Sequence, residues 1–266
     1  MLRTTFSVYL AARLVLGASL TAPRALCAQV PIPQLPVPIS QAPVMVDSVP
    51  AFERPNGTLM RAGSLTYQLS LTTPQGQRVA LGTRTVVVSE ATLGGNRGWL
   101  IVDERTGTAV PTSDSVVVTR ADLMPERWSA TIARSQLGAS FTRDSVFGAV
   151  QTYQGRASFS LAIPANVLLS AGMLERVLEL LPLRDGYRAG ASLLVVDGLE
   201  PRVVPAEIVV ERAEPVTVGN REVDAWRVAL RWGAREQRLW ISRDGTRVVR
   251  TEQALPGGVL TAELQP

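Results

Sequence analysis

The feature that most constrains this fold is the alternation of apolar and polar residues in many short segments. In SLTYQLSLT, residues 64–72, every second residue from Leu65 is apolar and those between are polar. RASFSLAI, residues 156–163, follows much the same pattern. Because side chains two residues apart share one face of a β-strand, each segment is predicted to be a strand with one apolar and one wet face.

Other runs of similar character predict that most of the chain is β-structure. They are separated by Gly, Asn and Pro, the residues that favour turns. These predicted strands span residues 79–89, 97–103, 114–119, 126–133, 192–197 and 207–213. Strands with one apolar face, joined by short turns, predict an antiparallel sheet rather than a doubly wound parallel one.

One segment has helical instead of strand periodicity. In PANVLLSAGMLERVLELLPL, residues 164–183, apolar residues recur at helical spacing between two prolines. This stripe consists of Val167, Ala171, Leu174, Leu178 and Leu181. Glu175, Arg176 and Glu179 fall mostly off the stripe, so one amphipathic helix is predicted near residues 165–181. The expected fold is therefore mainly β (α+β): a curved antiparallel sheet or half-barrel with this helix packed across its concave face.

The N-terminus has the layout of a secretory signal peptide. A short start with Arg3 leads into an apolar run at residues 6–20 and then into small residues before position 29. Residues 1–28 are therefore predicted to be a signal peptide, and the protein to be exported to the periplasm or the extracellular space. Residues 29–56 are predicted to be a proline-rich extended linker, and 57–266 the half-barrel domain.

Removal of the leader changes both the charge and the cysteine content. Residues 1–28 contain three of the 27 basic residues and no acid, so 24 basic and 23 acidic residues remain, a formal charge of +1. Strong attraction to nucleic acid thereby loses its main support, whereas peripheral contact with a membrane stays open. Cys27 is the only cysteine, and the residues before it fit the lipoprotein pattern poorly, so lipid anchoring is not expected.

The absence of histidine and lysine excludes most catalytic arrangements. Ser–His–Asp, Cys–His and Ser–Lys sites cannot form, and sites for zinc and most other transition metals lose their usual ligands. No nucleotide-binding motif is present. No cofactor, metal site or catalytic residue is therefore predicted, and a non-enzymatic protein is expected. A hydrolase with two carboxylates is the enzyme class that remains open, because any two of 23 acids can converge in space.

Residues 226–250 combine seven arginines with three tryptophans, a mixture found on nucleic-acid-binding surfaces. A two-residue turn at Gly233-Ala234 would, however, pair residue 231 with 236 and residue 227 with 240. Arg231 then lies opposite Glu236, and Arg227 lies opposite Trp240. The same register forms an apolar wall of Trp226, Val228, Leu230, Leu239 and Ile241. This predicts a β-meander, and no nucleic-acid partner is expected.

Three segments of the second half carry a family resemblance: LPLRDGYRAGASLLVVDG, VTVGNREVDAWRVALRW and RLWISRDGTRVVRTEQ. They resemble a secreted bacterial family of unknown function, near the LolA/LolB-like superfamily of lipoprotein-carrier half-barrels. The resemblance covers roughly residues 57–262. It implies a concave sheet that holds an acyl chain or another apolar ligand.

Three hypotheses for function follow. The first is an envelope protein that binds a lipid or lipoprotein acyl chain, with Tyr67, Phe159, Trp226 and Leu230 as candidate lining residues. The second is a structural or assembly protein of the envelope whose concave face is filled by its own side chains. The third is a carboxylate-pair hydrolase. The oligomeric state stays open.

Overall fold

The structure, a computed structural model, describes residues 49–169, 172–197, 200–244 and 247–266. The predicted signal peptide at 1–28 and the larger part of the predicted linker, 29–48, lie outside the described residues. Residues 49–266 form one unit, to which the following description applies.

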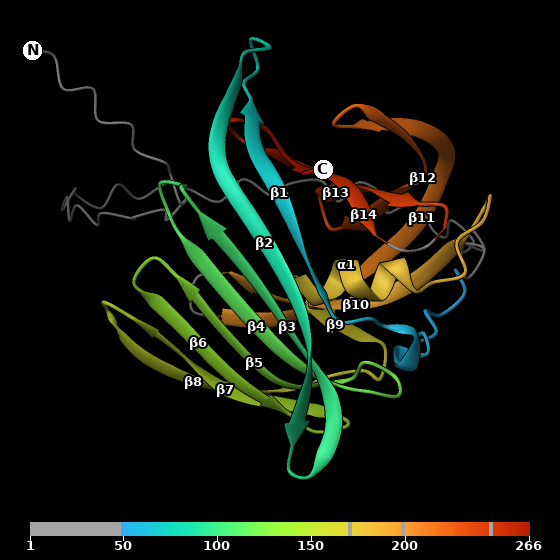
Figure 1. Cartoon of the computed structure of the whole chain (residues 1–266). Coiled ribbons are helices and arrows are strands. Elements are labelled where there is room, and N and C mark those ends of the chain that lie inside the picture. Colours follow the sequence, from blue (N-terminus) through green and yellow to red (C-terminus); the bar gives the residue numbers. More distant parts are fainter. Residues whose placement is uncertain (1–48, 170–171, 198–199, 245–246) are drawn as a thin grey trace, which may run out of the picture. The chain divides into compact units, whose positions relative to one another are not determined.

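This unit is built on one curved sheet of 15 strands (Figure 1). The first eight are β1 (Gly63–Thr72), β2 (Arg78–Leu93), β3 (Asn96–Thr106), β4 (Thr112–Thr119), β5 (Pro125–Ile132), β6 (Ser135–Phe141), β7 (Ser145–Thr152) and β8 (Gly155–Ala162). The other seven are β9 (Val167–Leu169), β10 (Arg188–Asp197), β11 (Glu200–Val218), β12 (Arg221–Trp232), β13 (Arg235–Ser242), β14 (Val248–Leu255) and β15 (Gly258–Leu264).

The order of the strands is that of two meanders joined in the middle. From one edge it runs β8 to β1, then β15 down to β9 at the other edge. The junction is the antiparallel pair β1–β15, in which Leu69 lies opposite Ala262. The first and last strands thus meet at the centre of the sheet, and the chain's midpoint forms its two edges.

The strand and fold-class predictions are confirmed. Five of the six further runs fall within strands, and the sixth, 126–133, extends one residue beyond β5. The strands pair antiparallel except for β9 with β10. The alternation also predicts burial correctly: Tyr67 and Leu69 of β1 are buried, and Ser158 and Ser160 of β8 are exposed. The result is a half-barrel-like sheet with a helix inside its curve.

The helix is shorter than predicted. α1 spans Gly172–Glu179, whereas Val167–Leu169 form strand β9, because they pair in parallel with Ser192–Leu194 of β10. α1 is the only α-helix in the described ranges, which also contain a 3₁₀ turn, η1 (Gly57–Leu59). No described helix is long and apolar enough to cross a membrane.

The register of the arginine-rich hairpin is as predicted. In β12–β13, Arg231 lies opposite Glu236 and Arg227 opposite Trp240. Gly233 has a positive φ of 55°, a conformation that glycine adopts without strain, which suits its place as the first residue of the turn. The β-meander prediction is therefore confirmed at residue level.

Residues 49–56, assigned to the linker from sequence, pack on the sheet. Ala51 forms a bridge with Gly190, and the Phe52 N–H donates to the Gly190 carbonyl at 2.8 Å. The Phe52 side chain is buried, and the Arg54 guanidinium donates to the carbonyls of Ala165, Leu123 and Val167. The folded unit therefore begins at Val49, eight residues before the predicted boundary.

This docking leads to a prediction about stability. Phe52→Ala is expected to lower the free energy of unfolding by about 3–5 kcal/mol, because it removes a buried aromatic side chain and leaves a cavity. Leu59→Ala, at a residue 61% exposed, should change it by less than about 0.5 kcal/mol. Urea unfolding followed by circular dichroism measures both. Equal, small losses would mean that the segment does not contribute to the folded unit.

Candidate functional site

The site suggested by the sequence is the concave face beneath α1. Every residue of α1 is buried, and the helix lies against β3, β4 and β9. The inward-facing residues of the C-terminal strands are also fully buried, among them Val228, Leu239 and Ile241. The concave face is therefore occupied by the protein's own side chains where α1 covers it.

The four candidate ligand-lining residues have different environments. Tyr67 of β1 and Leu230 of β12 are 0% exposed. Trp226 is half-buried, with the Arg243 guanidinium 4.8 Å from the centre of its ring. Phe159, on edge strand β8, lines a hollow of about 870 Å³ on β5–β8. Of the four, Phe159 is therefore the residue that borders an accessible hollow, although its ring packs over Gly148, on the opposite face of the sheet from Ser158.

A group of buried charges, which sequence reasoning missed, connects α1 to the sheet. Arg84 of β2 donates to both carboxylate oxygens of Asp103 on β3, at 2.9 and 2.7 Å. Its third nitrogen donates to Glu175 of α1 at 2.7 Å. All three residues are buried. Buried ions are tolerated when they are paired and hydrogen-bonded, as Arg84 is here on three sides.

A second part of this group uses the next residues of the helix. Arg176 pairs with Glu179 at 2.8 Å and donates to the Tyr67 hydroxyl at 3.3 Å. Glu179 accepts the backbone N–H of Val248 at 2.5 Å, and the Tyr67 hydroxyl donates to the Val248 carbonyl at 3.0 Å. We call Tyr67, Arg84, Asp103, Glu175, Arg176 and Glu179 the buried ion cluster. It joins β1, β2, β3 and β14 to α1.

The sequence did contain a signal for this cluster. Arg84 has the same strand parity as the buried Val86 and Val88, and Asp103 has the parity of the buried Trp99 and Ile101. Alternation therefore points both charges inward. A helix with charges on one side is normally expected to turn that side to water. Here the charged side is buried, because the sheet supplies partners for it.

Close approach of the helix to the sheet also depends on Gly172. A Cβ atom at this first residue of α1 would lie 2.9 Å from the Asp103 Cβ, too close for two carbon atoms. Glycine thus allows the helix to begin directly over the Arg84–Asp103 pair.

Burial shifts the acid–base properties of the carboxyls around α1. For Asp103 it favours the neutral form, but the Arg84 guanidinium outweighs it and lowers the pKa. Asp114 lies opposite Asp103 on β4 and accepts a hydrogen bond from the Trp128 indole at 3.1 Å. Burial raises the pKa of Asp114 to about 7. It also raises the pKa of Glu179 to about 7, despite the nearby Arg176.

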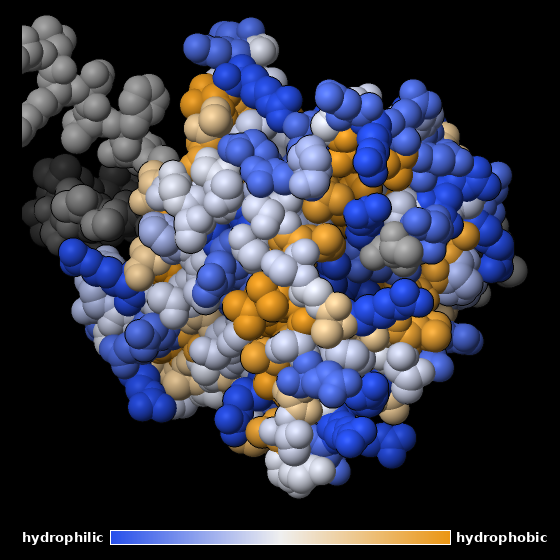
Figure 2. Space-filling model, in the orientation of Figure 1, coloured by the Kyte–Doolittle hydropathy of each residue, from blue (hydrophilic) through white to orange (hydrophobic). Residues whose placement is uncertain are grey.

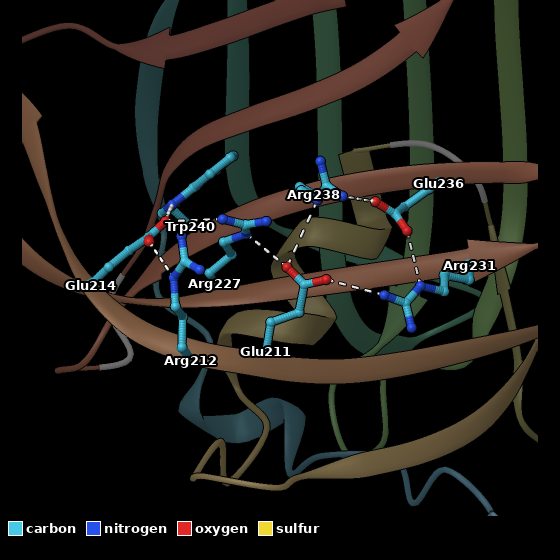
Figure 3. Close-up of polar contacts among 8 residues, drawn as sticks. All are labelled: Glu211, Arg212, Glu214, Arg227, Arg231, Glu236, Arg238 and Trp240. Atoms are coloured by element: carbon cyan, nitrogen blue, oxygen red, sulfur yellow. Dashed lines mark hydrogen bonds and ion pairs between the residues drawn. The ribbon is translucent and has the colours of Figure 1, made fainter.

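The opposite face of the C-terminal strands carries the arginine-rich stretch. Figure 3 shows Glu211 at the centre of three arginines. Glu211 pairs with Arg227 at 2.7 Å and with Arg231 at 3.1 Å, and lies 3.8 Å from Arg238. Glu236 joins Arg231 and Arg238 from the far side, at 2.9 and 2.6 Å. The predicted Arg231–Glu236 pair is therefore confirmed as part of a larger network.

The tryptophan in this stretch has a structural environment. The Trp240 indole donates to Glu214 at 2.6 Å, and its ring lies between Arg227 and Arg250, 5.9 and 5.0 Å from their guanidinium carbons. The predicted Arg227–Trp240 contact is thus confirmed.

Ten charged residues on this face form ion pairs with one another, and together we call them the arginine–glutamate ladder. Its members are Arg212, Arg227, Arg231, Arg238, Arg250, Glu211, Glu214, Glu236, Glu252 and Glu263. Each of these five arginines has a glutamate partner, and Arg78 also pairs with Glu263 from β2.

Within the ranges that the structure describes, no group of three or more acidic, histidine or cysteine side chains is arranged to hold a metal ion. On the face drawn in Figure 2, hydrophobic residues form separate strips between hydrophilic ones and not one continuous patch.

The buried ion cluster is expected to be important for stability. Arg84→Gln should lower the free energy of unfolding by about 3–5 kcal/mol, because it leaves two carboxylates buried without their cation. Arg78→Gln is the matched control: Arg78 pairs with Glu263, but its side chain is 52% exposed, so about 0–1 kcal/mol is expected. Urea unfolding of both variants makes the comparison. Similar losses in the two would contradict a special role for the buried pair.

The raised pKa values predict a dependence of stability on pH. Between about pH 4 and pH 7 the unfolded chain ionises Asp114 and Glu179, while the folded chain keeps both protonated. These groups therefore make stability fall as pH rises through this window, by at most about 1.4 kcal/mol per pH unit each. Asp114→Asn keeps an acceptor for Trp128 and should reduce this slope and stabilise the protein at pH 8. The free energy of unfolding of both proteins is measured at pH 5, 6, 7 and 8. A slope against pH that is the same in Asp114→Asn as in the unmodified protein would contradict the prediction.

Comparison with known proteins gives no family assignment. No family model matches the chain, and no curated protein matches it. A solved beta-barrel-like protein from Brucella abortus, named as a domain of unknown function (DUF1849), is similar with a TM-score of 0.47 and 8% identity, over 76% of this chain and 94% of that one. The hypothetical lipoprotein YmcC of Escherichia coli is similar with a TM-score of 0.32 and 15% identity, over 77% and 88%. Neither likeness is strong enough to assign the chain to a family or to relate it to the lipoprotein carriers.

Proposed function

We propose that this protein is an exported, non-enzymatic scaffold of the bacterial cell envelope, with a structural or assembly role. One observation carries the proposal: the concave face is filled beneath α1. Tyr67 and Leu230, which would line a ligand cavity there, are 0% exposed, and all of α1 is buried. A carrier of the expected type needs space for an acyl chain at this position.

The proposal of a non-enzymatic role rests on the same burial. Asp103 and Asp114 lie opposite each other on neighbouring strands, so they are one carboxylate pair of the kind that a hydrolase uses. Asp103 is buried and held by Arg84, and Asp114 is bound by Trp128. A substrate could not reach Asp103 without displacement of α1. The export proposal rests on the signal-like sequence of residues 1–28.

Binding of an apolar ligand beneath α1 is the second candidate, and one observation favours it. The apolar side chains of α1, among them Met173, Val177 and Leu178, lie in the core. The helix is also held by the ion pairs of the buried ion cluster. Outward movement of α1 would uncover an apolar surface that an acyl chain could cover. In this alternative the helix is a lid, whereas in the scaffold it is permanent.

The experiment is to express the full chain in a diderm bacterium and to recover it from each cell fraction. Export predicts a processed protein in the periplasmic fraction; an unprocessed cytoplasmic protein would contradict it. The purified protein is then extracted with organic solvent, and its acyl lipids are quantified by mass spectrometry. A scaffold should contain only traces of lipid. A stoichiometric acyl lipid would refute the scaffold and support the ligand-binding alternative.

A further inference from the structure

The hollow of about 870 Å³ on β5–β8 has a simple origin in the strand register. Ser129, Gly138, Ala149 and Ser158 lie side by side across the four strands. The neighbouring row on one side carries Thr131, Gln136, Gln151 and Arg156, and the row on the other side includes Ser140 and Phe147. Small side chains therefore form the floor of the hollow, and longer ones form its walls.

This hollow is separate from the concave face under α1. The floor residues alternate along their strands with Trp128, Leu137 and Val150, which are buried on the other side of the sheet. At the centre of the floor is Gly138, where an added Cβ would meet no atom within 4 Å. The space above Gly138 is therefore open.

The lining is mixed: polar side chains predominate on the outer face, and Leu137, Ala139, Phe147 and Phe159 also border the hollow. Four hydroxyl groups come from Ser129, Thr131, Ser140 and Ser158, two amides from Gln136 and Gln151, and one guanidinium from Arg156. The lining contains no carboxylate. Phe147 contributes an aromatic side chain that is 48% exposed. Hydroxyls and amides beside one exposed ring are suited to a sugar, whose hydroxyls form hydrogen bonds and whose ring packs on an aromatic face.

The charges around the hollow select an anionic ligand. Residues 125–162, which span β5 to β8, contain four arginines and two acids, Glu126 and Asp144, a net charge of +2. Asp144 accepts hydrogen bonds from Thr142 and Ser145. Arg127, Arg134, Arg143 and Arg156 have no carboxylate partner among the described residues. In the arginine–glutamate ladder, by contrast, every arginine has a glutamate partner.

These arginines lie at both ends of the strands. Arg127, at the start of β5, and Arg143, in the β6–β7 turn, are at one end; Arg134, in the β5–β6 turn, and Arg156, near the β7–β8 turn, are at the other. A chain lying along the hollow would meet cations at each end and hydroxyls, amides and Phe147 between them. Guanidinium groups bind carboxylates and similar anions through paired hydrogen bonds.

We propose that the β5–β8 hollow binds an acidic polysaccharide. Single-stranded nucleic acid is the other anionic polymer to consider, but its binding sites stack successive bases on several aromatic rings. Phe147 is the one well-exposed ring of the lining; Phe159, which also borders the hollow, is half-buried with its ring over Gly148. The other groups of the outer face are mainly sugar-compatible polar ones. The site lies on the opposite face from α1, so this proposal does not depend on whether the concave face is a scaffold or a carrier.

The test is calorimetric titration of the purified protein with three probes: an oligogalacturonate, a neutral dextran of equal length and an oligothymidine. The oligogalacturonate should bind and the dextran should not. Arg156→Gln should weaken binding about tenfold, as expected for loss of one charge-assisted contact. Gly138→Val should abolish it, because the new side chain fills the floor. Arg221→Gln, at an exposed arginine in another part of the sheet, should leave affinity unchanged.

Folding and competing results are part of the same experiment. Thermal melting by circular dichroism shows whether each variant is folded, and Phe147→Ser, at a solvent-exposed position, serves in place of Gly138→Val if that variant is unstable. Equal binding of dextran and oligogalacturonate would overturn the proposal. It would also be overturned if Arg156→Gln and Gly138→Val bound the oligogalacturonate with the same affinity as the control Arg221→Gln. Tighter binding of oligothymidine would replace the polysaccharide with a nucleic acid.

Discussion

The contact of Arg84 with Asp103 and Glu175 is the interaction on which the arrangement of this protein depends. Three buried charges are costly unless each finds a partner, and here one guanidinium satisfies a carboxylate from the sheet and one from the helix. The helix position is therefore determined by direction-dependent hydrogen bonds as well as by apolar packing. Tyr67 and Glu179 extend this effect to β14 by using both backbone groups of Val248. Loss of the Arg84 guanidinium would leave Asp103 of the sheet and Glu175 of the helix buried without their cation. The helix and the strands beneath it are therefore expected to be destabilised together.

The sequence predicts those parts of the fold that depend on local pattern. Period-two alternation identified most strands and the face that each of them buries, and the turn residues Gly233-Ala234 determined the register of the β12–β13 hairpin. What it could not predict depends on residues far apart in the chain. Glu175 is 91 positions from Arg84, so nothing near the helix indicated that its charged side would be buried. Val167–Leu169 suit a helix or a strand equally well, and their pairing with distant β10 decides the outcome. The unit also starts earlier than predicted, since proline-rich residues gave no sign that Phe52 would be buried.

The candidate site was predicted less well than the fold, for a related reason. A choice of inward-facing aromatic and aliphatic residues assumes that an apolar face is available to a ligand. Whether that face is empty depends on what else the chain places on it, and α1 fills it with side chains and ion pairs. The one candidate residue next to an accessible hollow, Phe159, is on edge strand β8, far along the sheet from the other three.

Arginine content alone is therefore a poor guide to function in this chain, and the strand register is a better one. In the ladder, the arginines of β11–β13 pair with glutamates of the same three strands, and Trp240 packs between two arginines. A sequence that looks like a polyanion-binding surface therefore contributes to the sheet itself. On β5–β8 the local sequence looks unremarkable, yet four arginines share their region with two acids, Glu126 and Asp144. Binding capacity follows from charge that has no partner within the protein. The concave face is filled beneath α1, and every arginine of the ladder has a glutamate partner. The outer face of β5–β8, whose four arginines have no carboxylate partner among the described residues, is therefore the surface that we propose for an external ligand.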